Sequence, residues 1–162
     1  MCDCGFVQSN KWFRYRAAAI IVEDGCVLFV GNESANYYYS VGGGVHLGET
    51  AEDAVLREVQ EETGVRYEID RLAIIHENFF RDKRDNGDTV MDCHEIAFYF
   101  LMKPRGTKQL NSNSFTLGGH KEEMYWLPID KMEKYRAFPS FMKDYLTNEQ
   151  PDTILHIVTD ER

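Results

Sequence analysis

The chain has 162 residues, and its 27 acidic residues outnumber its 18 lysines and arginines to give a formal net charge of −9. Because long nucleic acids are bound through clustered positive charge, this acidic balance argues against DNA or RNA as a partner. No apolar run reaches the roughly 18 residues that a membrane helix needs, and the first residues lack a basic-then-apolar secretion signal. We therefore expect no membrane association and a cytoplasmic location.

One domain over residues 1–162 is the expected organisation, because this length is typical of a single domain with its own core. Hydrophobic residues make up 43% of the chain, which is enough to fill such a core. Whether two copies associate as a homodimer stays open.

The first part of the chain predicts a loose start followed by strands. Residues 1–10 are expected to be loose, whereas 12–22 alternate in part and then become continuously apolar, as a strand buried on both faces does. Glu23-Asp24-Gly25 is a hairpin signal, so 26–30 should be the returning strand. Residues 37–39 are expected to form a short strand that leads into a glycine-rich loop.

The glycine-rich loop, residues 43–49, feeds directly into a helix predicted over 51–63. Thr50 is a good N-cap residue, and Asp53 three positions later can return a capping-box contact. Gly64 stands where helices commonly end in a left-handed residue.

The acidic residues of this helix occupy one side of it. On a helical wheel at about 100° per residue, Glu58, Glu61 and Glu62 fall within one arc, on the half that also carries small apolar residues and should face the protein. Like charges at this spacing repel, and partial burial makes each ionised form costlier. A hard divalent cation with oxygen ligands, Mg²⁺ or Mn²⁺, would resolve the conflict. A surface acidic helix is the alternative.

The rest of the chain predicts further strands with two short helical segments between them. These are strands at 67–80, 90–102, 123–127 and 152–159, a helical turn after Pro128, and a helix over 139–147. Residues 81–89 and 111–120 are predicted as loops. Strands interleaved with helices indicate an α/β fold in which a mixed sheet packs between helices.

The motif across residues 43–65 resembles the Nudix box at every specified position. The matching residues, with the family's spacing, are Gly43, Glu49, Arg57-Glu58-Val59, Glu61-Glu62 and Gly64-Val65. A departure lies just upstream, where Val41-Gly42 stands in place of the proline and glycine that the family often has. The resemblance implies a Nudix-type α/β/α sandwich with a mixed β-sheet.

The resemblance also implies an enzyme that cleaves the pyrophosphate linkage of a nucleoside diphosphate joined to another group, with water attacking phosphorus. Glu58, Glu61 and Glu62 would be the catalytic ligands of the Mg²⁺ or Mn²⁺ cofactor, which lowers the pKa of bound water and aligns it for displacement. Which residue takes the proton of the water is left open.

The other motif residues are assigned to positioning and substrate binding. Arg57 is expected to lie away from the metal face and to hold the loop, by pairing with Glu49. Glu49 is either that partner or an additional metal ligand. Gly43 and Gly44 let the backbone approach the phosphates or take a positive φ, and Gly42 could equally carry the special conformation.

Outside the motif, candidate substrate contacts come from three places. In many relatives an acidic residue before a Trp-containing strand acts as base or extra ligand, and here Glu122 or Glu123 precedes Trp126. Arg16, at the head of the first strand, is expected either to reach a phosphate or to be exposed. Five aromatic residues are candidates for stacking on a base or for the core: Tyr37, Tyr38, Tyr39, Phe80 and Phe138.

Two substrate groups lose support from the sequence. The cluster that NADH-cleaving relatives carry after the box is absent, and Phe80 stands where relatives acting on ADP-ribose often have proline. What remains is a small phosphorylated nucleotide: a nucleoside triphosphate, a nucleotide sugar or a dinucleoside polyphosphate.

Two other functions stay open as alternatives. A catalytically inactive nucleotide-sensing or scaffold module of the same fold should have lost a helix glutamate, and here all are present. Isomerase chemistry on a prenyl diphosphate would require a cysteine in the pocket, for which Cys93 is the candidate. Cys2 and Cys4 are expected to have no consequence, the alternative being a zinc site completed by Cys93 and His94.

Overall fold

The computed structural model describes residues 1–32, 36–83, 89–112 and 121–162, and the predicted loops at 81–89 and 111–120 lie largely outside these ranges. Within them the elements follow in this order: β1 (Gly5–Gln8), β2 (Lys11–Ile20), β3 (Val22–Glu23), β4 (Cys26–Asn32), β5 (Tyr38–Ser40), β6 (Gly42–Gly44), α1 (Ala51–Thr63), β7 (Ile69–Lys83), β8 (Val90–Met102), β9 (Glu122–Pro128), the 3₁₀ helix η1 (Ile129–Lys134), β10 (Ala137–Phe138), α2 (Met142–Thr147) and β11 (Leu155–Asp160).

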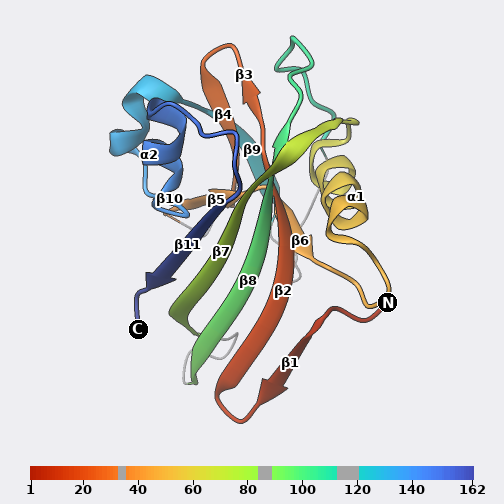
Figure 1. The fold of residues 1–162 in the computed structure, drawn as a ribbon, viewed down its shortest axis with the longest axis vertical. Coiled ribbons are helices and arrows are strands. Elements are labelled where there is room, and N and C mark those ends of the chain that lie inside the picture. Colours follow the sequence, from red (N-terminus) through yellow and green to blue (C-terminus); the bar gives the residue numbers. More distant parts are fainter. Residues whose placement is uncertain (33–35, 84–88, 113–120) are drawn as a thin grey trace.

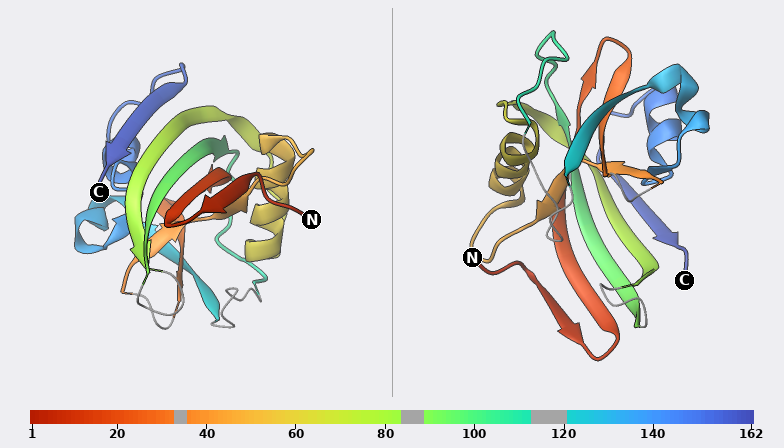
Figure 2. Two further views of the ribbon diagram at one scale, coloured as in Figure 1. Left: turned by 90° about the horizontal axis from the view of Figure 1, so that it is seen from below. Right: turned by 180° about the vertical axis from the view of Figure 1, so that it is seen from behind.

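A mixed sheet forms the centre of the molecule (Figure 1). In the described part of the chain it has six strands, in the order β1-β2-β8-β7-β11, and β6 also pairs with β2. The β2–β8 and β7–β11 pairs are parallel, whereas the other pairs are antiparallel. A second sheet has the order β10-β5-β4-β3, with β9 paired to β4 (Figure 2).

Helices cover both sides of the central sheet, as the predicted α/β/α sandwich requires. Ala17 and Ala19 of β2 belong to the apolar cluster beneath α1, while Ala18 and Ile20 belong to the cluster on the opposite side, beneath α2 and η1. Because successive strand residues point to opposite faces, a strand covered on both sides is continuously apolar. None of the helices in the described ranges has the length and hydropathy that crossing a bilayer requires.

The motif helix has the bounds that its sequence predicts. Oγ1 of Thr50 accepts a hydrogen bond from the backbone N–H of Asp53 (3.1 Å) and donates one to the Asp53 carboxylate (2.9 Å). Gly64 ends the helix in the left-handed conformation, with φ 71°. The prediction succeeds because both ends are determined by residues next to the helix in sequence.

The N-terminus is not the loose segment that the sequence analysis predicted. Gly5–Gln8 form β1, which pairs antiparallel with β2, and the residues before it lie along the glycine-rich loop, where the N–H of Cys4 donates to the carbonyl of Val45 (2.7 Å). All four residues of β1 are exposed, so the strand has no buried apolar face that a sequence analysis could detect.

Gly42 takes the special backbone conformation that the sequence left open among three glycines. Its φ is 140°, a value that side-chain-bearing residues rarely adopt. Gly42 also pairs with Ala18 of β2, and a Cβ atom added to it would lie 2.6 Å from the Cα of Ala18. The close approach of the loop to β2 therefore requires glycine here.

We predict that Gly42→Ala lowers the free energy of unfolding by more than roughly 3 kcal/mol, because it combines backbone strain with a clash against β2. Gly48→Ala is the matched control: its φ is 88°, but an added Cβ would meet no atom within 4 Å. The control should lose only about 1–2 kcal/mol, from strain alone. Urea unfolding of both variants measures the difference, and equal losses would contradict the clash.

Candidate active site

Two glutamates of α1 lie directly behind the glycine-rich loop. The side chain of Glu58 is 14% exposed, and a Cβ added to Gly43 would stand 2.5 Å from its carboxylate, so backbone and carboxylate touch. Glu62 is 8% exposed, and its Oε2 accepts a hydrogen bond from the N–H of Gly42 (3.0 Å). The loop and the helix thus form one wall in which two carboxylates are held.

Glu61 differs from the position that the helical wheel gave it. The wheel placed three carboxylates on the protein side, whereas the side chain of Glu61 is 59% exposed and lies at the rim of the site. The buried residues of α1 run around the wheel from Ala54 to Thr63, and Glu61 lies just outside the Ala54 edge of this packed face. Glu61 still belongs to the cluster, since Nη1 of Arg57 reaches its carboxylate at 3.5 Å.

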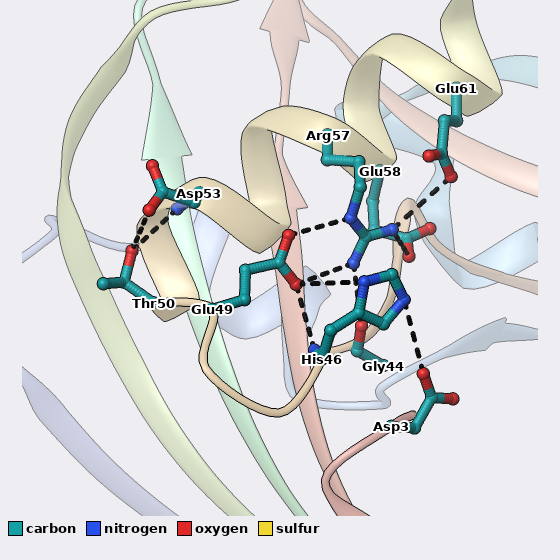
Figure 3. Close-up of polar contacts among 9 residues, drawn as sticks. All are labelled: Asp3, Gly44, His46, Glu49, Thr50, Asp53, Arg57, Glu58 and Glu61. Atoms are coloured by element: carbon teal, nitrogen blue, oxygen red, sulfur yellow. Dashed lines mark hydrogen bonds and ion pairs between the residues drawn. The ribbon is translucent and has the colours of Figure 1, made fainter. Parts of the chain in front are cut away.

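Arg57 joins the loop to the helix (Figure 3). Its Nε and Nη2 donate to the two carboxylate oxygens of Glu49 (2.8 and 3.0 Å), Nη2 also donates to the carbonyl of Gly44 (3.0 Å), and Nη1 donates to Glu58 (2.5 Å). The predicted pair with Glu49 is therefore present, but the expectation that Arg57 lies away from the acidic face is wrong. Its guanidinium contacts that face through Glu58.

The Arg57–Glu49 contact dominates the electrostatics of the loop. Hydrogen bonds from Arg57 lower the pKa of Glu49 to about 2, with a smaller contribution from the backbone N–H of His46. The hydrogen bond to Glu49 likewise raises the pKa of Arg57. Both oxygens of Glu49 are engaged by the guanidinium, which favours its role as the partner of Arg57 over its role as a metal ligand.

The carboxylates of Glu58 and Glu62 have raised pKa values, in contrast to that of Glu49. Burial raises the pKa of Glu62 to about 8 and that of Glu58 above its usual range, although Arg57 and Arg16 oppose the shifts. The positive charge of Arg57 and Arg16 is therefore too small to offset the cost of burying these ionised carboxylates. The arrangement fits a divalent cation with oxygen ligands, which would supply that charge.

The donor set is open rather than a closed cage. No three Asp, Glu, His or Cys side chains in the described ranges converge on one point at metal-binding distance. Mg²⁺ usually keeps several waters and binds through one or two carboxylates together with substrate phosphates, so an open set of Glu58, Glu61 and Glu62 is suited to it. Among the described residues, Cys2 and Cys4 likewise belong to no group of three such side chains that could hold a zinc ion.

Arg16 links this wall to a cavity. It is 7% exposed, so the expectation of an exposed strand end is wrong. Its Nη1 donates to Oγ of Ser40 (3.0 Å), and its Nη2 donates to the carbonyls of Ser40 (2.6 Å) and Gly42 (3.3 Å). Burial lowers the pKa of Arg16, but the nearby acidic groups outweigh this effect and raise the pKa overall, so the positive charge is retained. These groups are Tyr99, Glu95, Glu62 and Glu58.

The cavity beside Arg16 has a volume of about 600 Å³ and is formed by β2, β5, β7, β8 and the residues near β10 and β11. Four of the five candidate stacking aromatics line it, namely Tyr37, Tyr39, Phe80 and Phe138. The fifth, Tyr38, packs edge-on against Tyr125 and Tyr135. Such a volume with aromatic walls is typical of a small-molecule site.

Several cavity residues were not found from the sequence. Arg14 of β2 forms an ion pair with the buried Glu95 of β8 and lies over the ring of Trp12 at 4.8 Å. These residues meet because β2 and β8 pair in parallel, with Arg14 opposite Glu95. Charged residues within a strand usually indicate a solvent face, and the parallel register that overrides this reading has no local signal.

Of the two acidic residues before Trp126, the structure couples Glu122 to the helix. The charge of Glu122 contributes to the raised pKa of Glu62, and its carboxylate accepts a hydrogen bond from the hydroxyl of Tyr39 (3.0 Å). Glu123, the other candidate, accepts from the hydroxyl of Tyr125 (2.7 Å). Because strand neighbours point to opposite faces, only one of the two can face the site.

Cys93 is not placed for chemistry in the cavity. It is buried, it is not among the residues that line the cavity, and its thiol donates to the carbonyl of Met91 (3.6 Å). Burial raises the pKa of the Cys93 thiol. The isomerase alternative therefore loses its candidate nucleophile.

Comparison with known proteins identifies the class. A model of the NUDIX domain matches residues 12–148. A MutT-like protein of Streptomyces ambofaciens is 30% identical over 121 residues, which is 75% of this chain and 67% of that protein. This chain belongs to the NUDIX family, and its class is that of the nucleotide pyrophosphohydrolases.

Solved structures agree on the fold. A MutT protein from Bacillus halodurans superposes with a TM-score of 0.59 at 16% identity, covering 91% of each chain. An ADP-ribose pyrophosphatase from Streptococcus suis superposes with a TM-score of 0.57 at 15% identity, covering 88% of this chain and 98% of that one.

We predict that Arg57→Lys lowers the free energy of unfolding by about 2 kcal/mol, because an ammonium group cannot bind both oxygens of Glu49 and the carbonyl of Gly44 together. The exposed Arg66→Lys is the control and should stay within roughly 0.5 kcal/mol of the wild type. Chemical denaturation measures both. A loss no larger than that of the control would show that the loop does not depend on the guanidinium.

A second prediction concerns His76, whose pKa is lowered from 6.5 to about 4 by burial, with Glu95 opposing and Arg16 adding to the shift. Between these values the unfolded chain binds a proton at His76 that the folded protein does not, so the contribution of His76 to the free energy of unfolding is complete above pH 6.5 and is lost as the pH approaches 4. The loss should be roughly 3 kcal/mol. His76→Phe should remove this contribution from the pH profile of stability, whereas the exposed His156→Gln should not; a profile of His76→Phe identical to that of the wild type would contradict a buried neutral His76.

Proposed function

We propose that this chain is a Mg²⁺- or Mn²⁺-dependent enzyme that cleaves the pyrophosphate linkage of a small nucleotide, with water attacking phosphorus. The observation that carries the proposal is the position of two carboxylates, the buried Glu62 and the half-buried Glu58, against a glycine-rich loop that is joined through Arg16 to a cavity of about 600 Å³. Ligand cavities of this size accommodate a nucleoside.

Glu58, Glu61 and Glu62 would hold the cation in this scheme. A bound divalent ion neutralises phosphate charge and lowers the pKa of water. The protein contributes the positions of the ligands: Arg57 holds Glu58 against the loop, and the N–H of Gly42 holds Glu62. Glu49 acts on the site through Arg57, as a positioning residue.

The substrate would extend from the loop into the cavity. We expect phosphate oxygens to meet the backbone of Gly43 and Gly44; the space that their missing side chains leave is filled by the carboxylates of Glu58 and Asp3. Arg16 would place positive charge where the loop meets the cavity, and the nucleoside would lie among the aromatic residues beyond it. Glu122 is a candidate acceptor for the proton of the attacking water, because its charge already acts on Glu62.

The inactive sensing or scaffold module is the alternative, and a hydrolysis assay separates the two. Nucleoside triphosphates, nucleotide sugars and dinucleoside polyphosphates should be incubated with the protein and Mg²⁺ in ¹⁸O-labelled water. We expect turnover of at least one group, with the label in a phosphate product and no turnover in excess EDTA. Turnover in EDTA would contradict the role of the metal, and no turnover of any nucleotide would favour the sensing module.

We predict that Glu62→Gln lowers kcat by at least about a hundredfold, because the amide cannot supply the charge that holds the cation. Glu52→Gln, on the exposed face of the same helix, is the matched control and should remain within about twofold of the wild type. Steady-state kinetics with the best nucleotide measures both variants. Wild-type turnover by Glu62→Gln would remove this residue from the site.

A further inference from the structure

The end of the cavity away from the glycine-rich loop contains a chain of polar groups, of which His76 is buried and Asn78 and Thr159 are half-buried. His76, Asn78 and Phe80 alternate along β7, so all three face the cavity. The parallel strand β11 places Thr159 opposite Asn78, and Thr159 lines the cavity as well.

These groups form a hydrogen-bonded relay. Nε2 of His76 lies 2.7 Å from Oγ1 of Thr159, and the Thr159 hydroxyl donates to Oδ1 of Asn78 at 2.9 Å. A hydroxyl has one proton to donate, so this arrangement requires Nε2–H of His76 to donate to Thr159. The reverse relay would have the Asn78 amide nitrogen donating to Thr159 and the hydroxyl donating to Nε2.

The other ring nitrogen of His76 decides between the two directions. His76 is 1% exposed, and its Nδ1 has no hydrogen-bond partner among the described residues. In the reverse relay a neutral ring would carry its proton on Nδ1 and leave a buried N–H donor unsatisfied. The first arrangement, in which Nε2–H donates to Thr159, leaves only an unpaired acceptor at Nδ1. Unsatisfied buried N–H groups are rarer and costlier than unsatisfied acceptors.

Burial also keeps the His76 ring neutral at pH 7, since it lowers the pKa of His76 to about 4. Glu95, Arg16 and the rings of Tyr99 and Phe141 are its other neighbours. A neutral ring with its proton on Nε2 fixes the Thr159 hydroxyl, which in turn fixes the amide of Asn78 with Oδ1 turned toward β11.

The amide nitrogen of Asn78 is thereby left as a donor. Among the described residues it has no acceptor, and Asn78 is half-buried in the cavity wall. We propose that Asn78 is a specificity-determining residue, oriented by Thr159 and His76, whose N–H group selects nucleobases that present an oxo group over those that present an amino group. This inference rests on the proposed function, because it assumes that the cavity holds a nucleoside.

The placement of the base at this end follows from the rest of the cavity. Phosphates belong near Gly42–Gly44 and Arg16, so the base lies farther along β7. Phe80 is on the same strand as Asn78, and Arg136 lies over the rings of Tyr37 and Phe138 (5.9 and 5.7 Å) at the rim. Aromatic walls bind the faces of any base, so discrimination has to come from an edge contact such as that of Asn78.

Inosine and adenosine monophosphate test the inference directly, because they differ in having an oxo or an amino group at the same ring carbon. Calorimetric titration without metal should show that the wild type binds the oxo nucleotide roughly tenfold more tightly or better. Asn78→Asp offers only acceptors and should invert the preference, and Asn78→Ser should bring the ratio to about one. Kinetics with the corresponding triphosphates and Mg²⁺ provides a second readout.

The relay itself is tested by Thr159→Val, which frees the Asn78 amide to rotate and should reduce the preference severalfold. Thr153→Val, at an exposed position before β11, is the control and should leave the ratio unchanged. Equal binding of the two nucleotides by the wild type, or an unchanged ratio in folded Asn78→Asp and Asn78→Ser, would overturn the inference while leaving the hydrolase proposal intact. Failure to bind or hydrolyse any nucleotide would overturn both.

Discussion

The guanidinium of Arg57 is the interaction on which the rest of the site depends. It binds both oxygens of Glu49, the carbonyl of Gly44 and the carboxylate of Glu58, so one side chain connects the start of the loop, its end and the helix. A lysine could satisfy only part of this set, because its donors radiate from one atom rather than lying in a planar fork. Arg57 therefore joins both ends of the loop to α1, as the proposed binding of a cation and a phosphate requires.

Stability and function oppose each other on the inner face of α1. Burial raises the pKa of Glu58 and Glu62, which means that their ionised forms are costly in the absence of a cation. A helix selected only for packing would have apolar residues at these positions. The apolar cluster beneath α1, which includes Val55 and Val59, compensates for this cost and keeps the helix against the sheet.

The sequence predicts the loop and the helix well because their determinants are local. Thr50 and Asp53 act within the first turn of α1, and Gly64 acts at its last turn. The alternation or continuity of apolar residues identifies most strands. The cavity is different, because it is assembled by the parallel pairs β2–β8 and β7–β11, which join residues distant in sequence. Arg14 with Glu95, and Asn78 with Thr159, become neighbours only through these registers, and neither register leaves a periodic signal. The strand β1 was not predicted because none of its residues is buried, so it has no buried apolar face to detect in the sequence.

The proposed hydrolysis depends on the binding of a divalent cation by the acidic face of α1. Titration of the protein with Mn²⁺, followed by electron paramagnetic resonance of the free ion, tests it most directly. We expect saturable binding by the wild type that strengthens when a nucleotide is added, and affinity at least about tenfold weaker in Glu62→Gln but not in Glu52→Gln. Equal Mn²⁺ affinity in the wild type and Glu62→Gln, with or without nucleotide, would contradict it.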